Sequence, residues 1–198
     1  MTANGGILET LRNSGALKEG HFVLSSGRHS DRYIEKFDLL RQPTATSEVC
    51  RFIAEHFRDQ QIDVIVGPTT GGVLLAFEVA RQLGVAAAYA ERSSDAEARR
   101  EFRRGTTFPF GGRVLVVDDI LTTGGSIRET LDALAAHSVE VAGVAVLVDR
   151  SGGEADLGVH FVALATMDIT TWDASDCPMC QRGQPVAKPG TTPSPGTA

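Results

Sequence analysis

Apolar residues follow two alternating spacings along this chain, and these spacings predict an alternation of strands and helices. Unbroken apolar, largely β-branched runs predict strands at 63–67, 85–91, 113–119, 140–150 and 161–167. Apolar residues at helical spacing predict helices at 7–14, 43–60, 71–83 and 126–137. Strands without polar alternation are covered on both faces, so the pattern predicts an α/β fold with a central parallel sheet flanked by helices.

Four polar or glycine-rich turns follow these predicted strands. They read VGPTTGG (66–72), AERSS (90–94), DDILTTGGS (118–126) and VDRSGG (148–153). The carboxyl ends of parallel strands meet at one edge of a sheet, where α/β proteins bind their ligands. We therefore expect the four turns to lie close together and to form a site.

Two segments do not fit the alternation of strand and helix. Residues 21–37 are predicted as two extended pieces around a Ser-Gly turn, and 92–112 form an arginine-rich insertion of the length typical of lids. The Pro/Gly/Thr-rich end, 188–198, is predicted to be a disordered tail. We expect one domain over 1–187.

Composition and charge exclude several classes of protein. A net charge of -6 argues against a nucleic-acid-binding surface, which needs clustered Lys and Arg. The chain has neither an apolar run long enough to span a bilayer nor a signal-peptide pattern, so a cytoplasmic protein is expected. Only Lys18, Lys36 and Lys188 are lysines.

The turn Thr122–Ser126 (TTGGS) lies between a predicted strand and a predicted helix, which is a typical place for a phosphate group. The chain contains neither Gly-Lys nor Gly-x-Gly, so the P-loop and the dinucleotide fingerprint are both excluded. Backbone N–H groups, hydroxyls and the positive end of a helix can nevertheless surround a phosphate without a lysine.

Asp118 and Asp119 immediately precede this turn. Two carboxylates would repel the bound phosphate, but they can accept hydrogen bonds from vicinal hydroxyls or hold the water shell of Mg²⁺. A ribose 5-phosphate meets both requirements. The alternative is an Asp pair that only caps the following loop; the whole string of apolar strand, DD, TTGGS and helix favours the ligand site.

The string VLVVDDILTTGGS (114–126) resembles the 5-phosphoribosyl-1-pyrophosphate (PRPP) motif of the type I phosphoribosyltransferases. Over about residues 5–190 the chain is similar to the orotate phosphoribosyltransferase branch of that family. Residues 16–40 resemble its N-terminal hood, 148–153 its base-contacting segment, and CPMCQRGQPVAKPG its C-terminus in one bacterial and archaeal subgroup. The implied fold is a parallel sheet with a small, mainly N-terminal hood.

The resemblance implies a role for each part of the site. The implied PRPP-binding residues are Asp118, Asp119, Ile120, Leu121, Thr122, Thr123, Gly124, Gly125, Ser126, Thr69, Thr70 and Gly71, with a cis peptide at Thr69–Thr70. The implied orotate-binding residues are Thr122, Arg150, Tyr33 and Ile34. The implied catalytic residues are Asp118, Asp119, Arg92, Arg99 and Arg100. Mg²⁺ and a homodimer whose lid closes over the partner's site are also implied.

The chain departs from the family pattern at three places. Gly71 stands where a lysine is common, Ser25 stands where a basic residue is frequent, and 92–112 contain neither Lys nor His. We expect lid arginines to neutralise the departing pyrophosphate instead. If 96–104 were helical, Arg99 and Arg103 would share one face, and Arg100 and Arg104 another. The alternative is a solvated basic stretch.

Several other residues were weighed as ligands or contacts. Cys177 and Cys180 form half of a tetrahedral zinc set, which would need Cys50, a distant His or a second subunit; ordinary thiols are the favoured interpretation. His21 and His29 are expected to satisfy local backbone groups. Phe108 and Phe110 could pack at the lid hinge or cover the base.

Together with the residues, the resemblance implies transfer of a phosphoribosyl group from PRPP to orotate in pyrimidine biosynthesis. A phosphoribosyltransferase for a purine or for uracil is the alternative within the family, and Arg150 favours an anionic base. A PRPP-sensing regulator without catalysis is the alternative outside it. That alternative expects a nucleic-acid-binding element, which the sequence does not display.

Overall fold

The computed structural model describes residues 3–24, 26–93 and 99–189. The helices are α1 (Ala3–Asn13), α2 (Lys36–Leu40), α3 (Pro43–Phe57), α4 (Gly71–Leu83), α5 (Gly125–Ala135) and α6 (Pro178–Gln181). The strands are β1 (Leu17–Val23), β2 (His29–Ile34), β3 (Val64–Pro68), β4 (Ala86–Arg92), β5 (Arg100–Glu101), β6 (Gly112–Leu121), β7 (Val139–Asp149), β8 (Phe161–Thr166) and β9 (Thr171–Trp172).

The larger sheet has the strand order β5-β4-β3-β6-β7-β8. All neighbours pair in parallel except β5, which runs antiparallel to β4 at one edge. The predicted α/β fold with a parallel sheet is therefore confirmed, as are the five strands and four helices predicted from apolar spacing.

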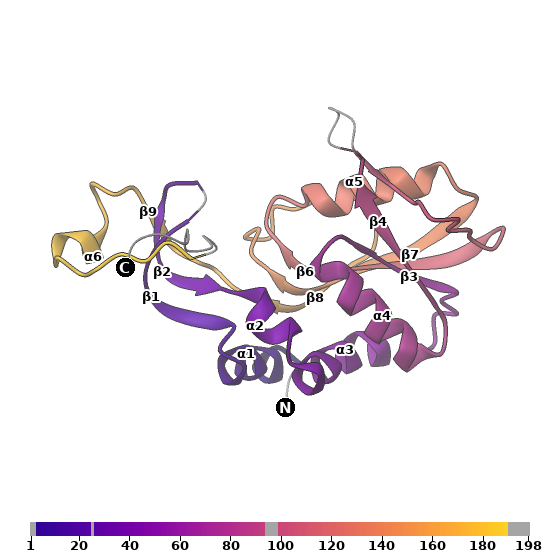
Figure 1. The fold of residues 1–198 in the computed structure, drawn as a ribbon, viewed down its shortest axis with the longest axis horizontal. Coiled ribbons are helices and arrows are strands. Elements are labelled where there is room, and N and C mark those ends of the chain that lie inside the picture. Colours follow the sequence, from indigo (N-terminus) through magenta and orange to yellow (C-terminus); the bar gives the residue numbers. More distant parts are fainter. Residues whose placement is uncertain (1–2, 25, 94–98, 190–198) are drawn as a thin grey trace.

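Side chains alternate between the two faces of this sheet, and each face has its own helical layer (Figure 1). On β6, Leu115 and Val117 belong to the core with α1, α3 and α4, whereas Val114 and Val116 pack on the other side with Ile127 and other residues of α5. Burial on both faces explains why these strands are continuously apolar.

The helix α3 illustrates how sequence sets these layers. Pro43 occupies its first turn, where the missing N–H has no helical partner to lose. Val49, Ile53 and Phe57 recur at four-residue spacing and are all buried against the sheet. The helix is amphipathic because only this stripe meets the core.

The smaller sheet, which we call the hood, has the order β1-β2-β9 and lies beyond the carboxyl edge of the large sheet (Figure 1). Its first two strands come from the predicted hood segment, 16–40. Its third strand and the helix α6 come from 171–181, near the other end of the chain. The third strand of the hood therefore comes from a segment far along the chain. Apolar spacing did not predict this strand, because β9 has only two residues.

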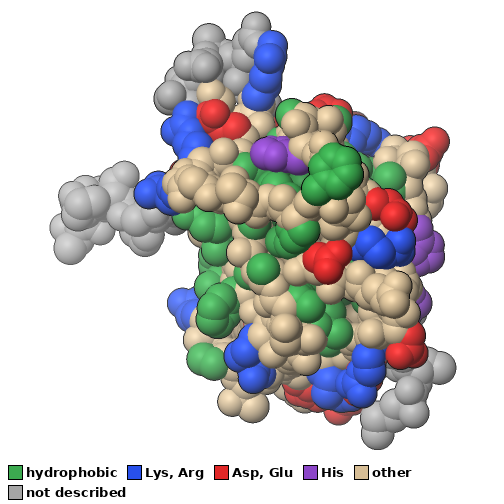
Figure 2. Space-filling view, turned by 90° about the vertical axis from the view of Figure 1, so that its right-hand side faces the viewer, with side chains coloured by type: hydrophobic (Ala, Val, Ile, Leu, Met, Phe, Trp, Pro, Cys, Tyr) green, Lys and Arg blue, Asp and Glu red, His purple; other side chains and the backbone are tan. Residues whose placement is uncertain are grey.

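The opposite end of the molecule carries charged side chains of both signs. Figure 2 looks onto this end, and Lys and Arg side chains there are scattered among Asp and Glu. In the part of the chain that the structure describes, no helix is long and apolar enough to cross a membrane.

Candidate functional site

The four predicted turns do meet at one edge of the large sheet, because β3, β4, β6 and β7 are parallel. A pocket of about 210 Å³ opens there. The residues lining it come from β4, β6 and the following turn and helix: Arg92, Asp118, Ile120, Leu121, Thr122, Thr123, Gly124, Gly125, Ser126, Ile127 and Glu129.

The turn 122–126 wraps this pocket and leads directly into α5. Gly124 has a φ of 78°, a left-handed conformation that costs a glycine little, and it is the N-cap of α5. The first N–H groups of a helix have no partner within it, and the helix dipole adds positive potential at the same place. The pocket is thus suited to an anion although no lysine lines it.

Asp118 and Asp119 are both buried, at 7% and 3% exposure, yet they face different parts of the site. Asp118 follows the Val114 and Val116 face of β6 and lines the pocket beside α5. Asp119 continues the other face, towards α2 and α4, where its carboxylate lies near Gly71. Adjacent strand residues point to opposite faces, so one dipeptide supplies an acid to each side of the sheet edge.

Each carboxylate also accepts a hydrogen bond from the next backbone N–H. The distances are 2.9 Å from Asp119 N to Asp118 Oδ1 and 2.8 Å from Ile120 N to Asp119 Oδ1. The alternative interpretation, a loop-capping Asp pair, is therefore realised in part. It uses one oxygen of each carboxylate and leaves the second for other contacts; Asp119 Oδ2 is buried and accepts no hydrogen bond.

The pKa of Asp118 is raised to about 7, chiefly by burial and secondly by the negative charge of neighbouring Asp119. The backbone bond from Asp119 N and the cations Lys36 and Arg100 oppose this rise. A hydrogen-bond donor in the pocket would favour the ionised form. The Asp118 carboxylate can thus accept a hydrogen bond from a hydroxyl group of a ligand.

The loop before α4 contains a cis peptide bond between Thr69 and Thr70, at the predicted place. Arg100 ties this loop to the phosphate turn: it donates to Thr69 Oγ1 at 3.1 Å and to Ser126 Oγ at 3.4 Å. It also donates to Ala90 O at 3.0 Å and is 6% exposed. One buried guanidinium therefore joins β4, the loop after β3 and the first turn of α5.

Arg150 follows β7 on the other side of the phosphate turn. Its backbone N donates to Leu121 O at 2.8 Å, which ties it to the strand that bears the two aspartates. Its side-chain Nε is buried and donates no hydrogen bond. Burial lowers the pKa of Arg150, whereas the interaction with Tyr33 of the hood raises it. An unsatisfied guanidinium donor therefore lies where the hood and the large sheet meet.

The comparisons agree with this geometry. A model of the phosphoribosyl transferase domain matches residues 38–177. An orotate phosphoribosyltransferase of Caldicellulosiruptor bescii is 43% identical over 93% of this chain and 95% of its own. The crystal structure of the orotate phosphoribosyltransferase from Aeropyrum pernix, 32% identical, aligns with a TM-score of 0.69 over 84% of this chain and 94% of that one.

The chain belongs to the orotate phosphoribosyltransferase family. A further structure, that of the Mycobacterium tuberculosis orotate phosphoribosyltransferase in complex with Fe(III) dicitrate, is 28% identical with a TM-score of 0.68, covering 83% of this chain and 97% of that chain.

The missing lysine at position 71 has a steric reason in this member of the family. A Cβ added to Gly71 would lie 1.8 Å from Asp119 Oδ2, so any side chain there must displace the carboxylate. A lysine comes instead from the hood: Lys36 Nζ lies 3.1 Å from Asp119 Oδ1 and 2.9 Å from Oδ2. The second contact is an ion pair without hydrogen-bond geometry.

Sequence reasoning did not identify Lys36 as a site residue. It begins α2, two residues after the end of β2, so the hood places it over the carboxyl edge. A signal was present, since the chain has only three lysines and this one lies in the predicted hood segment, 16–40. Its partner could not be found, because the ion pair joins positions 83 residues apart.

The lid arginines differ from the expected helix. Arg100 and Glu101 form β5, which pairs with β4, so the hypothesis of a helical 96–104 is wrong for its described part, 99–104. The chain is extended there and not helical, because the edge strand of the sheet has unpaired backbone N–H and C=O groups with which it can pair. Ser25 and residues 94–98, parts of the hood and lid predictions, lie outside the described residues.

The arginines of this insertion divide by their contacts. Arg92 is exposed and lines the pocket at the sheet edge, and Arg99 is exposed and lines a neighbouring hollow. Arg104 binds Glu91 with Nε at 2.8 Å from Oε1, and Arg103 pairs with Glu101. Arg100 is held by protein groups. The catalytic roles of Arg92, Arg99 and Arg100 stay predictions.

Tyr33 and Ile34 end β2 at the edge of the hood that faces Arg150. Phe108 packs edge-on against Phe102 and His137, whereas Phe110 is 94% exposed. Packing is therefore the observed role of Phe108.

His21 and His29 do not satisfy local backbone groups as expected. His21 Nδ1 contacts Gln184 O at 2.9 Å, 163 residues away, and both rings lie beside Cys177 and Cys180.

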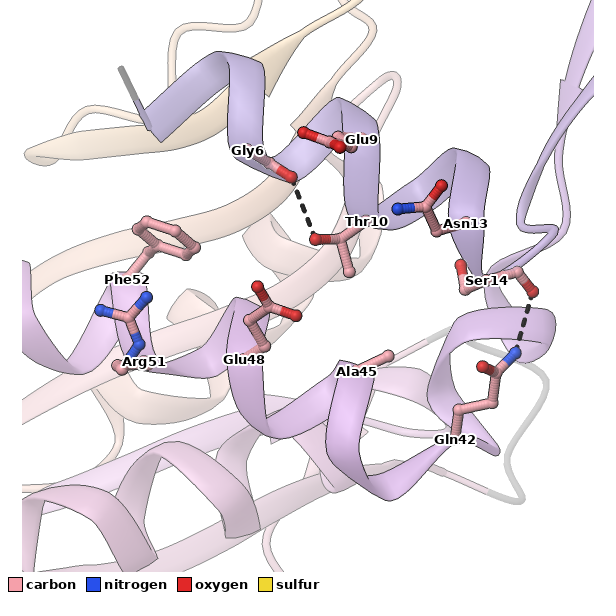
Figure 3. A pocket seen from close by; sticks show the side chains of 10 residues that line it. All are labelled: Gly6, Glu9, Thr10, Asn13, Ser14, Gln42, Ala45, Glu48, Arg51 and Phe52. Atoms are coloured by element: carbon pink, nitrogen blue, oxygen red, sulfur yellow. Dashed lines mark hydrogen bonds between the residues drawn. The ribbon is translucent and has the colours of Figure 1, made fainter. Parts of the chain in front are cut away.

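A second hollow, of about 540 Å³, lies between α1 and α3 (Figure 3). Glu9, Glu48 and Arg51 line it together with uncharged residues of both helices. It contains none of the residues of the strand-end turns. We therefore place the functional site at the carboxyl edge and not in this larger groove.

Proposed function

We propose that this protein transfers the 5-phosphoribosyl group of PRPP to orotate, forming orotidine 5-phosphate and pyrophosphate in pyrimidine biosynthesis. A ring nitrogen of orotate forms a bond to C1 of the ribose and loses its proton. The bond between C1 and the pyrophosphate oxygen breaks, and its electron pair leaves with pyrophosphate. The proposal rests on membership of the family, and it specifies orotate as the base.

One observation carries the choice of base: the buried, unpartnered Nε of Arg150 lies next to the phosphate turn. The Arg150 backbone is bonded to Leu121, and Leu121 precedes the turn 122–126 that lines the pocket. A planar guanidinium matches a carboxylate, and orotate differs from uracil by a carboxylate. A neutral purine would leave this donor unsatisfied, which costs binding free energy.

The remaining roles follow from charge. The turn 122–126 holds the 5-phosphate, and Asp118 and Asp119 accept hydrogen bonds from the ribose hydroxyls. Thr122 reaches towards the base, and the backbone of Tyr33 and Ile34 borders it. The loop 69–71 and the exposed Arg92 and Arg99 face the pyrophosphate, whose negative charge grows as the bond breaks. Closure of the lid would exclude water as a competing nucleophile.

Mg²⁺ fits this site as a partner of the pyrophosphate. The pocket-lining Asp118 offers a carboxylate oxygen of the kind that Mg²⁺ contacts through water, whereas Asp119 Oδ2 is already paired with Lys36. When bound, the ion would neutralise charge on the leaving group. The residues of this chain would hold the ribose and the phosphate, and Asp118 would contact the ion through water.

A homodimer is part of the proposal. Leu74 and Phe77 on α4 are 44% and 65% exposed and lie three residues apart on one helical face. Phe37 of the neighbouring α2 is 40% exposed. A second copy of this chain would cover these residues. We expect Phe77→Asp to shift the protein from dimer to monomer in sedimentation analysis, whereas Phe110→Asp leaves the mass unchanged.

The test of the proposed activity is pyrophosphate release from PRPP and Mg²⁺ with orotate, uracil, adenine or hypoxanthine as acceptor. We expect release with orotate alone. Arg150→Gln should lower kcat/KM for orotate roughly 10²-fold, while Arg51→Gln, an exposed arginine of α3 paired with Glu55, should leave it unchanged. Release with a neutral base only would overturn the choice of base, and release with none would overturn the proposal.

A further inference from the structure

Four potential metal ligands meet at the outer end of the hood: His21, His29, Cys177 and Cys180. Their ligand atoms all lie within 4.8 Å of one another. The pairs Cys177 Sγ to His21 Nε2 and Cys180 Sγ to His29 Nδ1 are 3.5 Å and 3.2 Å apart. This cluster is separate from the site at the carboxyl edge and has no role in the proposed reaction.

The chain brings the four residues together from three places. His21 lies on β1 and His29 opens β2, while Cys177 and Cys180 flank the first turn of α6 (Figure 1). The pairing of β1 with β2 shifts by one residue between Glu19 and Phe22, which marks a bulge. A bulge lets two consecutive residues turn inwards, and His21 and Phe22 are indeed both buried.

The separations suit a tetrahedral zinc ion. With Zn–S near 2.3 Å and Zn–N near 2.0 Å, tetrahedral angles place sulfur and nitrogen about 3.5 Å apart and two nitrogens about 3.3 Å apart. Cys177 Sγ and Cys180 Sγ lie 3.5 Å and 3.6 Å from His21 Nε2. The nitrogens His21 Nε2 and His29 Nδ1, at 2.7 Å, need to move apart by about half an ångström to admit the ion.

A further contact fixes the state of one ligand. His21 Nδ1 lies 2.9 Å from Gln184 O, so this nitrogen carries the proton and donates it to the carbonyl. The lone pair of Nε2 is then directed at the two sulfurs. Metal-binding histidines are oriented in this way by a hydrogen bond from the second ring nitrogen.

The hood has little else to hold its outer end. Phe22, Met179 and Cys177 are buried there, but they belong to neither of the two main core clusters. The C-terminal segment is joined to β1 by two backbone bonds, from Ala187 N to His21 O and from Val23 N to Ala187 O. Small units of this kind commonly need a metal or a disulfide to remain folded.

We propose that His21, His29, Cys177 and Cys180 bind one structural Zn²⁺ per chain. Four protein ligands close the coordination sphere, so the ion stabilises and does not catalyse. Binding converts the two thiols to thiolates and releases their protons. The ion fastens α6 and the segment after it to β1 and β2, and so steadies the hood strand that ends in Tyr33 and Ile34.

Metal analysis of the untagged, reduced protein tests the proposal directly. We expect about one zinc per chain, and replacement by Co²⁺ should give the visible and thiolate charge-transfer absorption of a tetrahedral cobalt site. Cys180→Ser and His29→Gln should each lose most of the metal. Cys50→Ala is the matched control, because Cys50 lies in the core away from the cluster, and it should retain the metal.

A stability measurement gives a second readout that does not depend on activity. Removal of zinc by a chelator should lower Tm by about 5 °C or more and speed hydrogen exchange in β1 and β2. Adding zinc back should reverse both changes. Cys180→Ser should be insensitive to the chelator. Zinc content near zero, no uptake by the reduced protein on titration, or equal metal in Cys180→Ser and wild type would each overturn the proposal.

Discussion

The carboxyl edge of the large sheet and the hood are built in opposite ways. The edge takes its strand, acids, turn and helix from one continuous stretch, 112–135, supported by two core clusters. The hood joins 17–34 to 171–187 and has few apolar residues of its own. Local sequence thus suffices for the turn at the sheet edge, whereas the side of the site that the hood borders depends on contacts between distant segments.

Lys36 connects the two regions. It begins α2, just after the hood strand β2, and pairs with Asp119 on the sheet edge, so the position of the hood is coupled to the charge of the site through one ion pair. The following changes, ordered by expected effect, separate contributions of the edge from those of the hood.

Asp119→Asn should have the largest effect. Loss of the carboxylate removes a hydrogen-bond acceptor for the ribose and leaves Lys36 without its anion. We expect kcat/KM for PRPP to fall roughly 10²–10³-fold, measured by pyrophosphate release. Circular dichroism should show the native fold. Wild-type turnover in this variant would contradict the role of the sheet edge.

Gly71→Ala should damage the same region sterically. The new methyl group would meet Asp119 Oδ2 and Leu40 Cδ1, so the loop and the acid must separate. We expect a loss of about 1–3 kcal/mol in the free energy of unfolding, measured in urea. Gly125→Ala is the control for stability, because the nearest atom to its Cβ, Thr123 Oγ1, is 3.8 Å away. Equal stability of the two variants would refute the close approach.

Lys36→Met tests the link between the regions. Asp119 would remain buried without its cation, at a cost of about 1–2 kcal/mol because the lysine is partly exposed. Lys18→Met, which removes the more exposed pair with Asp38, should cost less. Combining Lys36→Met with Asp119→Asn should recover stability. A double variant that is simply additive would show that the pair is not coupled.

Asp118→Asn should make stability less dependent on pH. The folded-state pKa of about 7 lies above the unfolded value near 3.8, so the folded protein binds this proton more tightly, and stability falls as pH rises from about 4 to 7. Asparagine does not ionise, so the free energy of unfolding of the variant should exceed that of wild type by about 1–3 kcal/mol at pH 8 but differ little at pH 4. Thermal unfolding across this range measures it, with Asp132→Asn, exposed on α5, as the control.

Arg28→Ala should have the smallest and most local effect. Arg28 joins β2 to β9 by donating to Thr171 Oγ1 at 2.9 Å and by an exposed ion pair with Asp173. Removing the Arg28 side chain should lower the free energy of unfolding by about 1 kcal/mol. Hydrogen exchange should quicken in β1 and β2 and stay unchanged in β6. A uniform change across both sheets would contradict the independence of the hood.

The sequence predicted much of the sheet and of the phosphate turn, because their signals are local. Unbroken apolar runs require burial on both faces, and VLVVDDILTTGGS encodes strand, acids, turn and helix within thirteen residues. The cis bond at Thr69–Thr70 was located by resemblance to the family. These features need no information about partners far along the chain.

Only the tertiary structure decided the contacts that close the site and the hood. The alternation of β6 sends Asp118 and Asp119 to different faces, the lid arginine Arg100 is drawn into the fold, and Lys36 forms an ion pair with Asp119 beside Gly71. Cys177 and Cys180 meet their histidines only because the fold brings together positions 151 to 159 residues apart. A linear pattern specifies which surfaces must be buried, but chain packing determines which distant polar groups meet there.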